Sequence, residues 1–259
     1  MLCADYHNHP QAHRTDLPYS KKVLEPWALK AKELGLLDIA LTDHDRYKDG
    51  FDFQEVWHLQ ERHPEIKIRA GIEMDNDPET SADGHRWVRE NYDMLDFVLG
   101  SVHFVHDFPF DHPHYMKEYE KYDINDLYRG YYKNLRTIAA TGLVDSMAHL
   151  DLIKIFNFFP TEDMTDVYDE TLSVIKDRDI SIEISTAGIR KPIGEIYPSK
   201  EIVQMAKDKG ISFTIAGDAH TANDLCHNYD KLEVFLKEMN IDEVAVYEKH
   251  EKNLIPAFV

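Results

Sequence analysis

Seven short apolar runs in this sequence each lead into residues that can bind a metal ion or a phosphate group. The runs cover residues 2–6, 38–42, 66–72, 97–102, 144–148, 180–184 and 213–217. In the same order, they lead into His7 and His9, Asp43 and His44, Glu73, His103, His149, Ser185, and Asp218 and His220. Polar residues that recur at the carboxyl ends of strands are typical of α/β enzymes whose active site lies at that edge of the sheet. The pattern therefore indicates an enzyme with a metal site.

The donor types narrow the choice of metal. Imidazole and carboxylate groups, with no cysteine among them, suit Zn, Mn or Fe. His7 and His9 are separated by one residue, as are Asp218 and His220, so each pair lies on one face of an extended segment. Glu73 is a carboxylate, which can bridge two cations. A single histidine at a strand end is more often a hydrogen-bonded core residue, but the repetition at successive strand ends disfavours that interpretation for the whole set.

Helical periodicity fills the stretches between the apolar runs. We expect helices within residues 20–35, 51–63, 84–92, 125–141, 161–178, 199–209 and 229–239. The first of them begins at Ser20, a good N-cap residue, and ends at Gly35, a residue type common just past a helix. Strands that alternate with helices favour a parallel sheet with right-handed crossovers.

The predicted fold is an α/β barrel in one domain that spans residues 1–259. No linker or repeat divides the chain, and its length is ordinary for a single barrel. Two connections, residues 104–123 and 188–198, are longer than usual and leave strand ends that carry polar residues, so we expect them to roof the site. We expect residues 243–247 to form a short eighth strand that closes the barrel imperfectly.

The composition disfavours several classes of partner. The chain carries 48 acidic and 29 basic side chains, for a formal net charge of −19, which disfavours long nucleic acids and anionic membranes. No apolar stretch approaches the roughly 20 residues that cross a bilayer. Two cysteines, Cys3 and Cys226, and an N-terminus unlike a signal peptide favour a reduced, cytoplasmic setting. The oligomeric state is left open.

The ordered set of motifs resembles one known family. The motifs His7-x-His9, Thr42-Asp43-His44, Glu73, His103, His149 and Asp218-x-His220 are similar to those of the polymerase and histidinol phosphatase (PHP) family of metal-dependent phosphoesterases. The likeness runs from the first strand to the last. It implies a distorted (β/α)7 TIM-like barrel that holds two or three divalent ions at the carboxyl ends of its strands.

The resemblance also implies a ligand set. It assigns His7, His9, Glu73 and Asp218 to a first ion, Glu73, His103 and His149 to a second, and His44 and His220 to a third. The third ion needs one more ligand from the loop after His9. The family has a His or Asp seven or eight residues after the first histidine, where this chain has Arg14 and Thr15. The flanking residues are His13 and Asp16, and we expect Asp16 to be the ligand in preference to His13.

A second set of matches points to a subfamily. Residues 146–154, 183–192 and 195–199 are similar to segments of histidinol-phosphate phosphatases. This likeness implies hydrolysis of L-histidinol phosphate to L-histidinol and phosphate, a step of histidine biosynthesis. The planar fork of Arg190 suits two phosphate oxygens, and we expect Arg14 to assist it. The alternative for the loop around Arg190 is a solvated basic segment.

The expected reaction is therefore phosphomonoester hydrolysis with a small phosphorylated substrate. A hydroxide that bridges the first two ions attacks phosphorus, with Glu73 and Asp218 holding those ions. The third ion, or a protonated His220 or Asp16, assists the departing alkoxide. One alternative is a PHP-type phosphoesterase for another small phosphomonoester or a short nucleotide. A second alternative, from a different class, is a non-catalytic metal-binding module.

Overall fold

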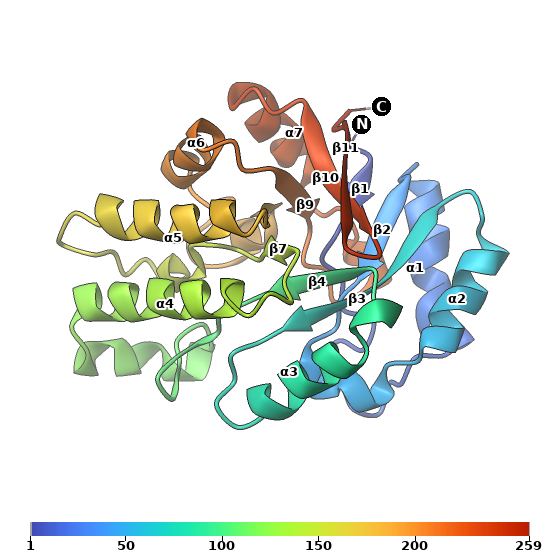
Figure 1. The fold of residues 1–259 in the computed structure, drawn as a ribbon, viewed down its shortest axis with the longest axis horizontal. Helices are drawn as coiled ribbons and strands as arrows, with labels where there is room; N and C mark the ends of the chain where they lie inside the picture. Colours follow the sequence, from blue (N-terminus) through green and yellow to red (C-terminus); the bar gives the residue numbers. More distant parts are fainter. Residues whose placement is uncertain (1, 259) are drawn as a thin grey trace.

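A seven-stranded parallel sheet forms the centre of the protein, as the computed structural model of residues 2–258 shows (Figure 1). Its strands are β1 (Ala4–Asp5), β2 (Asp38–Leu41), β3 (Lys67–Met74), β4 (Phe97–Gly100), β7 (Ser146–Met147), β8 (Ser181–Ser185) and β9 (Phe213–Ala216). They are hydrogen-bonded in that order, and each neighbouring pair is parallel. All carboxyl ends of the strands therefore meet at one edge.

Backbone hydrogen bonds between the first and last strands nearly close the sheet into a barrel. The Tyr6 amide donates to the Ile215 carbonyl at 3.0 Å, and the His9 amide donates to the Ala219 carbonyl at 2.8 Å. Asn8 and Ala219 form an isolated parallel bridge just beyond the ends of β1 and β9. The predicted seven-stranded, TIM-like barrel is confirmed.

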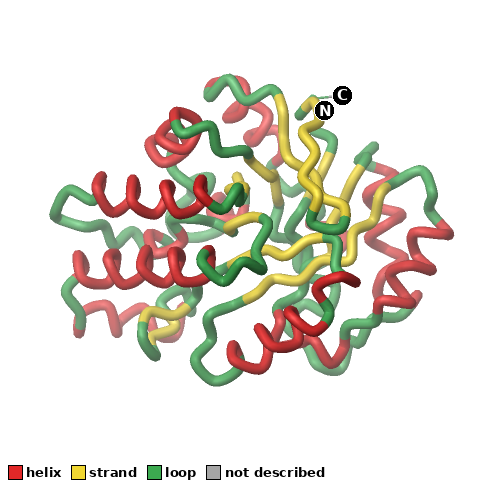
Figure 2. The backbone as a smooth tube through the Cα atoms, in the orientation of Figure 1, coloured by secondary structure: helices red, strands yellow, loops and turns green. Residues whose placement is uncertain are grey.

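Seven α-helices in residues 2–258 surround the sheet (Figures 1 and 2). They are α1 (Lys21–Glu33), α2 (Phe53–Arg62), α3 (Ser81–Glu90), α4 (Ile124–Ala139), α5 (Thr165–Asp177), α6 (Lys200–Asp208) and α7 (Tyr229–Glu238). Each coincides with a predicted helix, although α3 begins earlier than expected. The side chains of Asp52, Asp123 and Ser199 accept hydrogen bonds from the first amides of α2, α4 and α6. The predicted cap Ser20 makes no such bond.

The C-terminal segment is a separate antiparallel hairpin of β10 (Glu243–Glu248) and β11 (Glu251–Pro256). The expectation that residues 243–247 form an eighth barrel strand is thus wrong, because β9 already pairs back to β1. The hairpin instead fills the amino end of the barrel. Tyr247 packs on Phe97, with ring centroids 5.2 Å apart, and its hydroxyl lies 2.6 Å from Ser181 Oγ. This plug leaves the carboxyl end of the strands free for the site.

The first long connection is folded rather than irregular. It contains a short hairpin, β5 (Phe104–Val105) and β6 (Phe108–Pro109), and the 3₁₀ segment η3 (Pro113–Lys121). Asn76 and Asn134 both donate from Nδ2 to the Phe104 carbonyl, at 2.7 and 3.0 Å. The second connection begins with η5 (Ala187–Arg190). The remaining 3₁₀ segments are η1 (Asp45–Gly50), η2 (Tyr92–Met94), η4 (Leu152–Lys154) and η6 (Ala222–Asp224).

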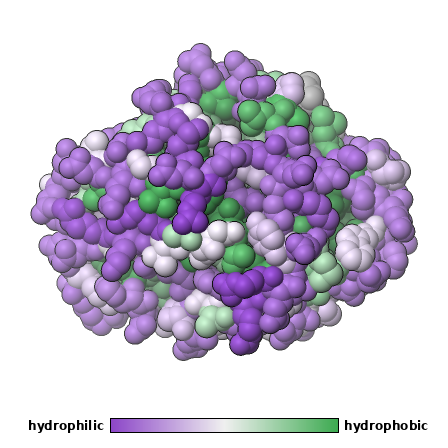
Figure 3. Space-filling model, viewed as in Figure 1, coloured by the Kyte–Doolittle hydropathy of each residue, from purple (hydrophilic) through white to green (hydrophobic). Residues whose placement is uncertain are grey.

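The visible face of the molecule is largely hydrophilic, with smaller hydrophobic areas between polar side chains (Figure 3). This agrees with the excess of acidic side chains in the sequence. Within residues 2–258, none of the helices combines the length and the apolar character required to cross a bilayer.

Candidate metal centre

Ligand-type side chains from several strands converge in one pocket of about 270 Å³ at the carboxyl edge of the barrel. Four groups of three have donor atoms that all lie within 4.8 Å of one another. The groups are His7, His9 and Asp218; Glu73, His103 and His149; His44, Asp75 and His103; and His9, His13 and His44. The structure therefore brings together the predicted ligands of the first and second ions.

Glu73 lies at the centre of this cluster and is almost fully buried. Its Oε2 is 3.1 Å from Nε2 of His7 and 3.1 Å from Nδ1 of His44. Its Oε1 is 3.6 Å from Nε2 of His149 and 3.8 Å from Nε2 of His103. Burial alone would raise the pKa of Glu73, but the imidazoles, His44 and His7 foremost, hold it well below its usual range. The two oxygens face different histidines, as a bridging carboxylate requires.

Asp218, just after the end of β9, faces His7 and His9. Its Oδ1 lies 3.2 Å from Nε2 of His9 and 3.8 Å from Nε2 of His7. Burial raises the pKa of Asp218, yet these imidazoles outweigh that effect and hold it well below the ordinary value. Asp218 thus presents an ionised oxygen to the first group of ligands.

Three residues of the site have left-handed backbone conformations. The φ angles are 61° at His13, 25° at His149 and 52° at Asp218. Non-glycine residues rarely adopt such angles, and they persist only where the surrounding structure enforces them. In this barrel, each of these turns directs a polar side chain back over the strand ends.

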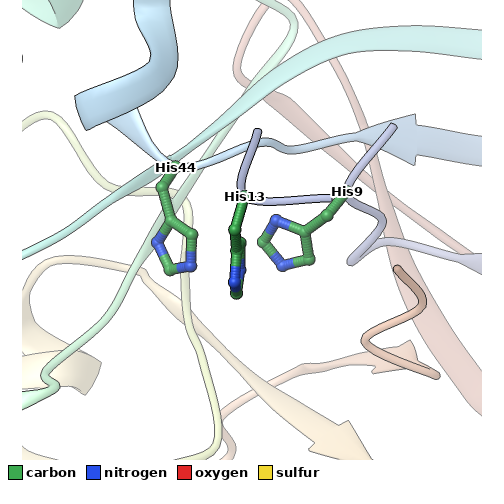
Figure 4. Close-up of side chains that lie close together, drawn as sticks. All are labelled: His9, His13 and His44. Atoms are coloured by element: carbon green, nitrogen blue, oxygen red, sulfur yellow. The ribbon is translucent and has the colours of Figure 1, made fainter. Parts of the chain in front are cut away.

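His13 rather than Asp16 lies in the group formed with His9 and His44, which favours His13 over the predicted Asp16 as a ligand of the third ion. Figure 4 shows the rings of His9, His13 and His44 side by side, and the His13 and His44 centroids are 4.9 Å apart. Asp16 is exposed and forms an ion pair with Arg14 at 2.6 Å. The left-handed turn at residues 12 and 13 explains the difference, because it brings the His13 ring against those of His9 and His44 before the chain leaves the site.

His220 lies at the mouth of the pocket, and its side chain is 35% exposed. Its Nε2 is 2.9 Å from Nε2 of His13, and its ring stacks on His9 with centroids 4.4 Å apart. Although His13 is exposed, desolvation and the neighbouring imidazoles of His9 and His220 lower its pKa to about 3, which favours the neutral ring. His13, His44 and His220 therefore offer three imidazoles for a third ion.

Neither Arg14 nor Arg190, the residues predicted to contact phosphate, lines the pocket. Arg14 is bound to Asp16 on the surface, as described above. Arg190 donates from one terminal nitrogen to the carbonyls of Gly217 and Asp218, at 2.7 and 2.9 Å. It therefore supports the backbone at Asp218. The basic side chains that do line the pocket are Arg46 and Lys191.

Sequence reasoning also missed acidic residues around the site. Asp75 is fully buried, and its Oδ1 lies 3.0 Å from Nδ1 of His103. Asp75 follows Glu73 by two positions, the same spacing as in the pair His7 and His9. This spacing could have identified Asp75 from the sequence. On β8 the residue that contacts a predicted metal ligand is Glu183, inside the strand, whose Oε2 lies 2.8 Å from Nδ1 of His7. Ser185, at the end of the strand, instead accepts a hydrogen bond at Oγ from the Ala187 amide.

The residues present fit divalent metal ions. Buried atoms of the cluster, Glu73 Oε1, Asp75 Oδ2 and His149 Nδ1, have no hydrogen-bond partner within residues 2–258. Buried polar atoms are normally paired, so orphaned atoms at one point indicate a missing ligand. The donor set of imidazoles and carboxylates without thiolates is the one that Zn, Mn or Fe prefers.

This combination defines a barrel enzyme with a multinuclear metal site at the carboxyl edge of its strands. Residues 5–187 match the family model of the PHP domain. The chain belongs to the PHP family.

Relatives and solved structures agree with that assignment. The chain is 32% identical over 237 residues to a probable histidinol-phosphatase of Deinococcus radiodurans, with 85% of this chain and 86% of the relative covered. It is 24% identical over 185 residues to the histidinol-phosphatase of Bacillus subtilis, covering 64% of this chain and 68% of the relative. The fold is similar to that of a histidinol phosphate phosphatase from Lactococcus lactis solved with Zn, L-histidinol and phosphate. The TM-score is 0.76, at 21% identity, with 97% and 98% of the two chains covered.

Proposed function

We propose that this protein is a metal-dependent phosphomonoester hydrolase that converts L-histidinol phosphate and water to L-histidinol and inorganic phosphate. The observation that carries the proposal is the buried group of imidazoles around Glu73, whose two oxygens face different sets of ligands. The relatives named above, one of them 32% identical over most of its length, support the choice of substrate.

The ligand groups suggest how the chain would hold its ions. His7, His9 and Asp218 would hold one ion, and His103 and His149 a second, with Glu73 shared between them. His13, His44 and His220 would hold a third. When bound, such ions supply Lewis acidity that stabilises charge on the phosphoryl oxygens and lowers the pKa of water.

The chain's own residues complete the site. Arg46 and Lys191 line the pocket, where their positive charges would offset the charge of a phosphate group. The hairpin β5–β6 and the start of η3 also contribute lining residues to the pocket. His220 lies at the mouth of the pocket, where the third ion that it helps to hold would stabilise the negative charge on the departing alkoxide.

A substrate panel tests this proposal. The purified protein is supplied separately with Zn, Mn or Fe(II). It is then assayed for hydrolysis of L-histidinol phosphate, phosphoserine, a nucleoside monophosphate and a dinucleotide. The proposal predicts the highest kcat/KM for L-histidinol phosphate. A higher value for a nucleotide would favour the alternative phosphoesterase, and no turnover with any metal would favour a non-catalytic module. The single-domain organisation and the cytoplasmic setting remain predictions from the sequence.

A further inference from the structure

One carboxylate in the pocket has no place in the metal cluster. Asp111 lies in the roof, between β6 and η3, and lines the same pocket as His103, His149 and Lys191. It belongs to none of the four groups of clustered donor atoms. Within residues 2–258 its side chain makes no hydrogen bond and no ion pair. Asp111 is therefore an unpaired acidic group facing the space above the metal ligands.

The backbone around Asp111 is firmly held. The preceding residue, Phe110, is fully buried and packs edge-on against Tyr131, with centroids 5.3 Å apart. On the other side, the His112 amide donates to the Pro109 carbonyl at 3.1 Å, which closes a turn around Asp111. The backbone that carries this carboxylate is thus held beside the pocket, and a bound ligand would not have to order a flexible loop.

Asp111 is half-buried. Burial raises its pKa above the ordinary value, with the charge of Asp75 acting in the same direction and His103, His149 and Lys191 acting against it. No basic side chain of the chain itself forms an ion pair with this carboxylate within residues 2–258.

The position of this carboxylate also bears on substrate choice. A phosphate held over the metal ligands would repel Asp111 across a small pocket, so a substrate without a positive charge would bind poorly. A substrate that carries an ammonium group next to its phosphate would pair both of its charges, the phosphate with the metal side and the ammonium with Asp111. A carboxylate beside a phosphate site therefore selects amino-alcohol phosphates over other phosphomonoesters.

We propose that Asp111 is a specificity-determining residue that binds the ammonium group of the substrate's amino-alcohol part. This inference rests on the proposed function, because it names the residue that recognises the amine of L-histidinol phosphate.

Two substrates that differ only in the amine provide the test. These are L-histidinol phosphate and its des-amino analogue, 3-(imidazol-4-yl)propyl phosphate, assayed at pH 8 with the parent, Asp111→Asn and Asp111→Glu. Asp107→Asn is the matched control, since Asp107 is an exposed carboxylate of the same roof that does not line the metal pocket. Metal content is measured for every protein, and binding of L-histidinol is measured by calorimetry.

Removing the charge should lower kcat/KM for L-histidinol phosphate by roughly ten- to a hundred-fold, mainly through KM. The same change should leave the des-amino analogue unaffected or slightly improved, weaken the binding of L-histidinol, and leave metal content intact. Asp111→Glu should recover part of the loss, and Asp107→Asn should behave like the parent.

The possible failures are distinguishable. If the parent does not hydrolyse L-histidinol phosphate, the proposed function is wrong and this inference falls with it. If the parent does so but Asp111→Asn lowers the rates of both substrates equally, only the role of Asp111 in amine recognition is wrong. A parent that does not prefer the aminated substrate would overturn that role as well.

Discussion

Glu183 contacts the ring of His7 on the side opposite to Glu73. The Oε2 atom of Glu183 lies 2.8 Å from Nδ1 of His7, while Nε2 of the same ring faces Glu73 at 3.1 Å. The other oxygen of Glu183 accepts a hydrogen bond from the backbone amide of His149 at 3.1 Å. A buried carboxylate on β8 thereby fixes ligands from β1 and β7. Such a partner orients the imidazole and increases its basicity toward a metal ion.

We predict that Glu183→Gln weakens metal binding by roughly ten- to a hundred-fold without a matching loss of folded structure. An amide keeps the shape of the side chain but removes the negative charge behind His7. Competition titration with a chelator of known affinity measures the effect. Glu251→Gln, an exposed change on β11, serves as the control. Unchanged metal affinity in Glu183→Gln would contradict the positioning role.

The left-handed turn at His13 leads to a prediction about the third ion. His13→Ala should lower both metal content and turnover, because His13 lies within ligand distance of His9 and His44. Asp16→Ala should keep both, since Asp16 is exposed and pairs with Arg14. Elemental analysis and steady-state kinetics on the two variants distinguish them. The reverse result would restore Asp16 as the ligand.

Substitution of Arg190 should change the affinity for metal more than it changes substrate binding. Its guanidinium donates to the carbonyls of Gly217 and Asp218, so Arg190→Gln should loosen the turn that presents Asp218. We expect a loss of roughly ten-fold in metal affinity, the scale of one to two hydrogen bonds. If KM for the substrate rises while metal affinity stays constant, Arg190 instead contacts phosphate.

A histidine far from the metal site should make stability depend on pH. His250, in the turn of the β10–β11 hairpin, places Nδ1 2.8 Å from Asp145 Oδ2 and Nε2 2.9 Å from the Tyr92 carbonyl. Its ring stacks on Tyr92 at 3.6 Å. Burial lowers the pKa of His250, but the hydrogen bond and charge of Asp145, aided by Asp96, outweigh it and raise the pKa above 6.5. The stabilisation is therefore complete below pH 6.5 and is lost as the pH rises through the folded-state pKa.

His250→Gln should accordingly lower the melting temperature more at pH 6 than at pH 9. A difference of about 2–4 °C corresponds to about 1 kcal/mol in a protein of this size. Thermal unfolding in the presence of a chelator measures it without interference from bound metal. His58→Gln, on the exposed face of α2, is the control. An equal deficit at both pH values would mean that His250 contributes only packing.

The alternation of apolar runs and amphipathic stretches was sufficient to predict the barrel and the residues at its carboxyl edge. Because the strands are buried, they appear in the sequence as apolar runs whose ends can be located. His7, Glu73 and His149 could therefore be placed at the carboxyl ends of strands. The eighth strand was predicted wrongly because a short apolar run such as 243–247 fits a barrel strand and a hairpin strand equally well. Only the pairing of β9 with β1 decides between them.

Contacts that depend on turns could not be predicted in the same way. The side chain of His13 reaches the site through two successive left-handed residues, which no periodicity reveals. Arg190 was predicted to bind phosphate from its planar fork and from the likeness of its loop to histidinol-phosphate phosphatases, whereas its partners here are backbone carbonyls of a distant turn. Glu183 was overlooked because a charged residue inside an apolar strand has no signature until its partner, His7, is placed beside it.

Removal and restoration of metal tests the central claim most directly. We predict that a chelator abolishes phosphate release from L-histidinol phosphate by the parent protein, and that Zn, Mn or Fe(II) restores it. Phosphate and L-histidinol should then appear in equal amounts. Glu73→Gln should stay inactive after the same treatment and should bind less metal. Full phosphate release by the chelated parent, or by Glu73→Gln, would contradict a hydrolase built around the Glu73 metal site.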